Sequence, residues 1–142
     1  MKLLTKRHAV ATACLTSALV MGGATAASAA PIGFYAYSTT EKTWISGTYQ
    51  YWKTGTGGGY AFYDGKFTGV TAKDRDPGDR YQAVVALDYD EFVGGGWRHV
   101  KKKVAVVNGT KSWTFKAKAN VKAFACDRLR GGKPVNCREW RT

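Results

Sequence analysis

One run of residues, 81–89 (YQAVVALDY), constrains the fold more than any other feature. Every odd-numbered side chain from Tyr81 to Tyr89 is apolar or aromatic, and these side chains fall on one face of an extended chain. This period of two is typical of a β-strand with one face in a core. No long stretch shows a 3.6-residue apolar period with caps, so the chain is predicted to be all-β.

Segments of the same character follow one another at near-regular spacing. They are rich in β-branched and aromatic residues and are separated by Gly, Asn and Asp. The remaining strand segments are 43–52, 60–63, 67–73, 97–107, 111–116, 119–126 and a last hairpin that ends near Trp140. Two pairs, Asp64-Gly65 and Asn108-Gly109, favour tight hairpin turns. The pattern predicts an antiparallel β-sandwich, or a barrel-like fold, of about eight short strands with one disulfide.

Residues 1–29 have the three zones of a secretory signal peptide. A basic start up to Arg7 precedes the uncharged run 9–23, and Ala27-Ser28-Ala29 forms an A-x-A cleavage pattern. The apolar run is shorter than the roughly 20 residues that span a bilayer, which disfavours a membrane anchor. We therefore predict a secreted, extracellular protein whose residues 30–142 form a single β-sandwich domain.

The cysteines predict one structural disulfide. Cys14 lies within the signal peptide and is expected to be lost with it, which leaves Cys126 and Cys137. In an oxidising compartment these two should pair. A zinc site would need more Cys or His nearby, and a redox pair would usually have the spacing C-x-x-C.

The charge balance predicts attraction to anionic surfaces. The chain has 22 Lys and Arg against 10 Asp and Glu, a net charge of +12. Cell-wall polymers, lipid head groups, nucleic acid and acidic polysaccharides are all partners for such a protein. The alternative is a solvated basic face that keeps the protein soluble and protects exposed strand edges.

Aromatic residues are the most suggestive feature for binding, and they crowd the segment from Tyr35 to Tyr63. In residues 49–52, successive side chains alternate between two faces, so an unsandwiched sheet leaves some aromatics exposed. Exposed Trp and Tyr can stack on sugar rings or anchor a protein partner, although aromatic packing in the core is the alternative. The candidate binding residues are Trp44, Tyr51, Trp52, Lys101, Lys102 and Lys103.

Catalytic constellations are sparse. His99 is the only histidine after residue 29, and no G-x-S-x-G elbow supplies a nucleophile for it. Arg98 and Glu91 lie near His99 as in some acid–base ribonucleases, but adjacent strand residues point to opposite faces. Asp88, Asp90 and Glu91 are carboxylates of the kind that a glycosidase pairs, or they form a solvated strand end. We predict no catalytic residues.

The run DRDPGD at 74–79 has two interpretations. Asp74, Asp76 and Asp79 resemble the spaced oxygen ligands of a calcium loop, but the sixth-position Gly and the closing Glu are missing. The other interpretation, which we favour, is a polar turn whose Asp residues pair with Arg75 and Arg80. No metal and no cofactor are therefore predicted.

A longer pattern carries a resemblance. It runs from F-x-G-V-x-x-K-D at 67–74 through A-V-V-A-L-D-Y at 83–89 to V-K-A-F-A-C, with a second Cys 11 residues later. This pattern resembles a group of small secreted actinobacterial proteins with a C-terminal two-Cys hairpin. Gly78-Asp79 stands where that group has Asp-Gly. The resemblance covers roughly residues 66–138 and implies a compact extracellular β-domain with no assigned catalytic residues.

Two functions remain. The first, which we favour, is a secreted, non-enzymatic binding domain that engages a glycan or an anionic cell-surface polymer, without specific nucleic-acid binding and without a membrane span. The alternative is a small secreted effector, namely an inhibitor, a toxin or a hydrolase with an unrecognised site. An enzyme would lose its activity on substitution of His99, Asp88 or Asp90, whereas a binding domain would not depend on them.

Overall fold

The computed structural model describes residues 29–142 and shows an antiparallel all-β fold. The predicted signal peptide, with Cys14, lies outside the described residues except for Ala29. The strands are β1 (Ile32–Tyr37), β2 (Thr43–Gly57), β3 (Tyr60–Asp74), β4 (Tyr81–Val93), β5 (Gly96–Val107), β6 (Gly109–Leu129) and β7 (Val135–Glu139). The prediction of an antiparallel all-β fold is confirmed.

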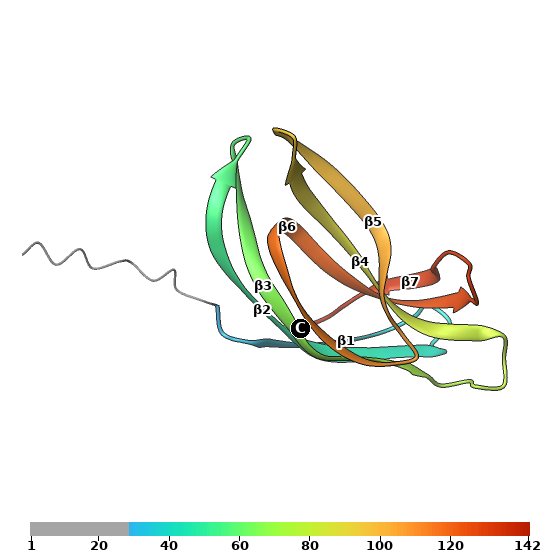
Figure 1. The fold of residues 1–142 in the computed structure, drawn as a ribbon. Helices are drawn as coiled ribbons and strands as arrows, with labels where there is room; N and C mark the ends of the chain where they lie inside the picture. Colours follow the sequence, from blue (N-terminus) through green and yellow to red (C-terminus); the bar gives the residue numbers. More distant parts are fainter. Residues whose placement is uncertain (1–28) are drawn as a thin grey trace, which may run out of the picture.

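The strands form one strongly curved sheet in the order β1-β2-β3-β6-β4-β5, with β7 paired to β6 (Figure 1). The sheet is not closed into a barrel. Strand β6 changes partner along its length: up to Lys118 it pairs with β3, and from Lys118 onward it pairs with β4. A bridge between Tyr35 and Arg141 joins the end of the chain to β1.

Two predicted hairpins are wrong. Asp64 and Gly65 lie inside β3, paired with Trp52 and Tyr51, so the segments 60–63 and 67–73 form one strand. Asn108-Gly109 does turn the chain, but β5 and β6 are not neighbours in the sheet. The predicted segments 111–116 and 119–126 likewise merge into β6, and β1 was not foreseen.

The core lies on the concave, inner face of the sheet. Its largest members are Phe34, Ile45, Tyr49, Phe67, Leu87 and Tyr89. Strand β4 supplies Ala83, Val85, Leu87 and Tyr89 to this face, as the alternation predicted. Its other face is also buried, because Val84 and Ala86 pack against Cys126 in a second, smaller cluster. Strand β4 is therefore covered on both sides, which explains its nearly continuous apolar sequence.

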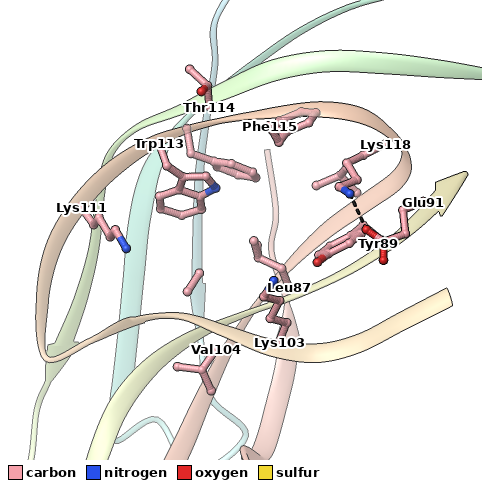
Figure 2. Close-up of a pocket in the computed structure, with 13 residues that line it drawn as sticks. Leu87, Tyr89, Glu91, Lys103, Val104, Lys111, Trp113, Thr114, Phe115 and Lys118 are labelled. Atoms are coloured by element: carbon pink, nitrogen blue, oxygen red, sulfur yellow. Dashed lines mark hydrogen bonds and ion pairs between the residues drawn. The ribbon is translucent and has the colours of Figure 1, made fainter. Parts of the chain in front are cut away.

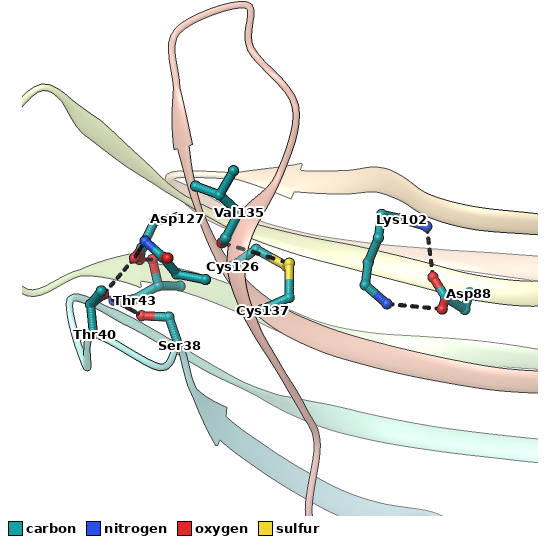
Figure 3. Close-up of a disulfide and its surroundings, with 10 residues drawn as sticks. Ser38, Thr40, Thr43, Asp88, Lys102, Cys126, Asp127, Val135 and Cys137 are labelled. Carbon is teal, nitrogen blue, oxygen red and sulfur yellow. Dashed lines mark hydrogen bonds and ion pairs between the residues drawn. A yellow bond between two sulfur atoms is a disulfide. The ribbon is translucent and has the colours of Figure 1, made fainter.

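The predicted disulfide is present. Cys126 and Cys137 are bonded and tie β6 to β7 across a separation of 11 residues (Figure 3). Next to it, the carboxylate of Asp127 is buried and accepts hydrogen bonds from Thr43 Oγ1 at 2.8 Å, from Asn136 Nδ2 at 3.0 Å and from Thr40 Oγ1. This network fastens the β1–β2 turn to the disulfide hairpin.

The 74–79 segment is a polar turn between β3 and β4. The prediction that its aspartates pair with Arg75 and Arg80 is wrong. Instead, Lys42 Nζ lies 3.2 Å from Asp76 Oδ2 and 2.7 Å from Asp79 Oδ2. The turn is therefore fastened to the start of β2.

Candidate binding cleft

A cleft of about 420 Å³ opens on the inner face between β5 and the first half of β6. Residues 109–117 of β6 lie against β3 on one edge, and within residues 29–142 no strand pairs with their other edge. The free edge of β5 stands opposite, because β4 is the one strand of the described chain that pairs with β5. The volume lies within the range of about 300–1,000 Å³ that is usual for small-ligand sites.

Asn108 explains why β5 and β6 separate here. Its backbone N–H donates to the Ala83 carbonyl at 2.9 Å, and its Oδ1 accepts from the Ala83 N–H at 2.8 Å. Both groups of Asn108 are thus bonded to β4. The chain leaves this corner towards β3, and the space between the two strands becomes the cleft.

Aromatic side chains line one wall of the cleft. Trp113 stacks on Phe67 with ring centroids 4.7 Å apart, and Phe115 and Tyr89 lie nearby (Figure 2). Trp113 is only half-buried and lines the cleft, so part of its ring is accessible from it. An indole in this position can stack on a planar or ring-shaped ligand.

The cleft is predominantly positive. Lys103, Lys111 and Lys118 line it together with one acid, Glu91. Lys118 Nζ is paired with Glu91 Oε2, and Arg98 pairs with Oε1 of the same carboxylate. Lys103 and Lys111 are exposed and have no ion-pair partner among residues 29–142. These two lysines are therefore available to an anionic ligand.

The pKa of Glu91 is lowered to about 2. Lys118 is the main cause, because its ammonium donates a hydrogen bond to the carboxylate, and Arg98 is the second. The carboxylate therefore stays charged at all ordinary pH values and neutralises one lysine of the cleft.

The structure separates the three predicted aromatic binding residues. Trp44 and Trp52 are half-buried and lie on the outer face of β2. Tyr51 lies on the inner face, where it stacks on Tyr49 with centroids 5.2 Å apart and meets Tyr63 edge-on. These three residues therefore do not form one patch.

The three predicted lysines likewise do not act together at one site. Lys102 is held in place, because its backbone N–H and its Nζ donate to Asp88 at 2.6 and 2.9 Å (Figure 3). Its Nζ also lies 3.1 Å from the centre of the Phe124 ring. Lys101 and Lys103 are exposed, and Lys103 alone lines the cleft. Of the predicted binding residues, then, only Lys103 belongs to this site.

The candidate acid–base residues lie on two faces, as predicted. Arg98 pairs with Glu91 on the cleft side. His99 Nδ1 contacts Asp90 Oδ1, and Asn120 Nδ2 donates to Asp90 Oδ2 at 2.6 Å. Asp90 lines a second pocket instead of the cleft. Among residues 29–142, no group of three or more His, Cys, Asp or Glu is arranged to hold a metal ion.

Sequence reasoning missed Lys111 and Trp113, which are central to the cleft. Both lie in the segment 111–116, for which the sequence predicts a strand and no binding role. Their alternation, Lys111, Trp113 and Phe115, shows that they share a face, but only the separation of β5 from β6 shows that this face is open.

Comparison of the chain with protein-family profiles, with curated proteins and with solved structures gave no match. The resemblance to small secreted actinobacterial proteins therefore stays a prediction. From Ala29 to Thr142, the structure has no helix long and apolar enough to cross a membrane.

Proposed function

We propose that this protein is a secreted, non-enzymatic binding module for anionic carbohydrate polymers, and that the ligand lies in the cleft between β5 and β6. The observation that carries the proposal is that Lys103 and Lys111, which have no ion-pair partner among residues 29–142, line the cleft together with the half-buried Trp113. A sugar ring stacks on the indole while its acidic group meets an ammonium.

Two further features support this ligand class. After residue 29 the chain has 19 Lys and Arg against 10 Asp and Glu, and this net charge of +9 attracts polyanions over a distance and raises the rate of encounter. The cleft is open along the free edges of two strands, so a long polymer can enter without threading its end. Both features fit a polymer better than a compact metabolite.

The proposal is tested by isothermal titration calorimetry with three ligands. Hexagalacturonate carries both sugar rings and charge, short-chain polyphosphate carries charge alone, and cellohexaose carries rings alone. The expected order of affinity is hexagalacturonate, then polyphosphate, with cellohexaose weakest. Equal affinity for the two anions at every salt concentration would reduce the interaction to charge alone and would contradict a stacking role.

Matched variants locate the site. Lys103→Gln and Lys111→Gln should each weaken hexagalacturonate binding about fivefold, because each removes one partly screened ion pair. Lys101→Gln and Lys116→Gln remove the same charge from exposed positions outside the cleft and should change little. Equal losses in all four variants would overturn the assignment to the cleft.

Trp113→Leu tests the stacking contact separately. The variant keeps the charges of the cleft, so it should lose the preference for hexagalacturonate over polyphosphate while polyphosphate binding persists. Persistence of polyphosphate binding also shows that the variant is folded. An unchanged preference would contradict the role of Trp113.

A further inference from the structure

A second pocket, of about 380 Å³, lies where the β2–β3 and β4–β5 hairpins meet. The two hairpins form the arms that extend from the curved sheet in Figure 1, with the bend of β6 between them. Trp97 of β5 joins them, because its indole N–H donates to the Gly57 carbonyl at 3.0 Å. The pocket is thus bounded by both arms and by Asn120 of β6.

Three aromatic rings line this pocket, namely Tyr60, Tyr63 and Trp97. The rings of Tyr60 and Trp97 are nearly perpendicular, at 87°, with centroids 6.3 Å apart. Two π-faces at a right angle form two walls of a cage. Trp97 is held by its hydrogen bond and by an edge contact with Phe92 at 5.5 Å, so this wall is preformed.

Asp90 is the only charged residue that lines this pocket within the described chain. Burial raises the pKa of Asp90, but hydrogen bonds from Asn120 and His99 together outweigh burial and lower the pKa, so the carboxylate is ionised. Each of its oxygens has one partner and can accept another hydrogen bond or face a cation. The charge lining this pocket is therefore opposite to the predominant charge of the β5–β6 cleft.

We propose that the pocket between the hairpins binds an organic ammonium group, such as a trimethylammonium head, between Tyr60, Trp97 and the carboxylate of Asp90. Aromatic faces attract a cation through their quadrupole, most strongly when the cation is poorly hydrated, as a methylated ammonium is. A carboxylate at the side of the cage supplies the countercharge. The pocket is a site separate from the cleft and takes a ligand of opposite charge.

The test uses choline and its neutral isostere 3,3-dimethyl-1-butanol (dimethylbutanol below), in which carbon replaces the nitrogen. The readout is the indole N–H cross-peak of Trp97 in a ¹H–¹⁵N spectrum, with the Trp113 peak as an internal reference. Choline should move the Trp97 peak with a dissociation constant on the order of 1 mM. Dimethylbutanol should bind at least about tenfold more weakly, because it has the same shape without the charge.

Variants distinguish the cage from an unspecific pocket. Tyr60 is 69% exposed, so Tyr60→Leu removes a π-face without disturbing the core and should weaken choline binding about fivefold. Asp90→Asn should weaken it by a similar factor, whereas Tyr35→Leu, at an exposed tyrosine outside the pocket, should leave it unchanged. Equal binding of choline and dimethylbutanol, or no movement of the Trp97 peak, would overturn the proposal.

Discussion

Glu91 sets the charge of the cleft at the scale of a single residue. Its carboxylate holds both Lys118 and Arg98, so neither cation is available to a ligand. Glu91→Gln removes the negative charge and frees these two cations, and we expect hexagalacturonate to bind about threefold more tightly. Calorimetry of the variant measures this gain.

The matched control is Glu139→Gln. Glu139 pairs with Lys122 outside the cleft, at an Nζ–Oε2 distance of 3.2 Å. This substitution changes the net charge of the protein by the same amount and should leave the affinity almost unaltered. Weaker binding by Glu91→Gln than by the wild-type protein would contradict the proposed electrostatics of the cleft.

Asp127 makes the stability of the protein depend on pH. Burial raises its pKa, but hydrogen bonds from Thr40, Asn136 and Thr43 outweigh burial and lower it. The folded pKa thus lies below the unfolded value of about 3.9. The stabilisation is present above that value and is lost as the pH falls through the folded pKa.

We therefore expect the free energy of unfolding, measured by urea denaturation, to fall below about pH 4. Asp127→Asn should lose about 2 kcal/mol at neutral pH, because it leaves buried donors without a charged acceptor. The variant should also depend less on pH in the acid range. An identical pH dependence in the two proteins would show that Asp127 does not contribute to it.

The bend of β6 is a feature of a whole element, and two residues in the left-handed region produce it. Ala117 has a φ of 49° and Asn120 a φ of 51°. Their polar groups are held by the two strands between which β6 passes: the Ala117 N–H donates to Asp64 of β3 at 2.9 Å, and Asn120 donates to Asp90 of β4. These contacts redirect β6 from β3 to β4.

A left-handed conformation costs an L-residue with a Cβ about 1–2 kcal/mol. Ala117→Gly removes that cost but loosens the unfolded chain, so we expect a net gain of about 0.5 kcal/mol in the free energy of unfolding. Ala105→Gly, in β5 at an ordinary negative φ, should instead lose about 0.5–1 kcal/mol. Destabilisation of similar size in both variants would contradict strain at Ala117.

A strand could be predicted from the sequence where its residue pattern stays the same along its whole length. For strand β4 the sequence predicts which side chains face the core, because its alternation and its apolar content agree. Strands β3 and β6 were divided, because Asp64-Gly65 resembles a turn and the bend at Ala117 interrupts the pattern. The cleft could not be foreseen, since it depends on Asn108 bonding to Ala83 instead of closing a hairpin.

At the scale of the whole molecule, the disulfide and the cleft lie on opposite faces of β4. Cys126 packs with Val84 and Ala86, whereas Leu87 and Tyr89 line the cleft. The disulfide closes a loop between residues 11 positions apart, and in the chain-entropy model such a loop stabilises a protein by less than about 3 kcal/mol. Stability and binding should therefore be separable.

We expect a Cys126→Ala/Cys137→Ala double variant to lose about 2–3 kcal/mol in urea denaturation and to keep its affinity for hexagalacturonate at low temperature. A large loss of affinity in a protein that is still folded would contradict the separation of the two faces.

The most direct test of the binding cleft is a titration of the ¹⁵N-labelled protein with hexagalacturonate. The chain has five tryptophans, and each gives one indole cross-peak. Because Trp113 alone among them lines the cleft, its peak should shift most. Trp44 and Trp52, on the outer face of β2, should hardly move. The largest shifts at Trp44 and Trp52, with Trp113 unmoved, would place the ligand on the outer sheet and contradict the cleft as the binding site.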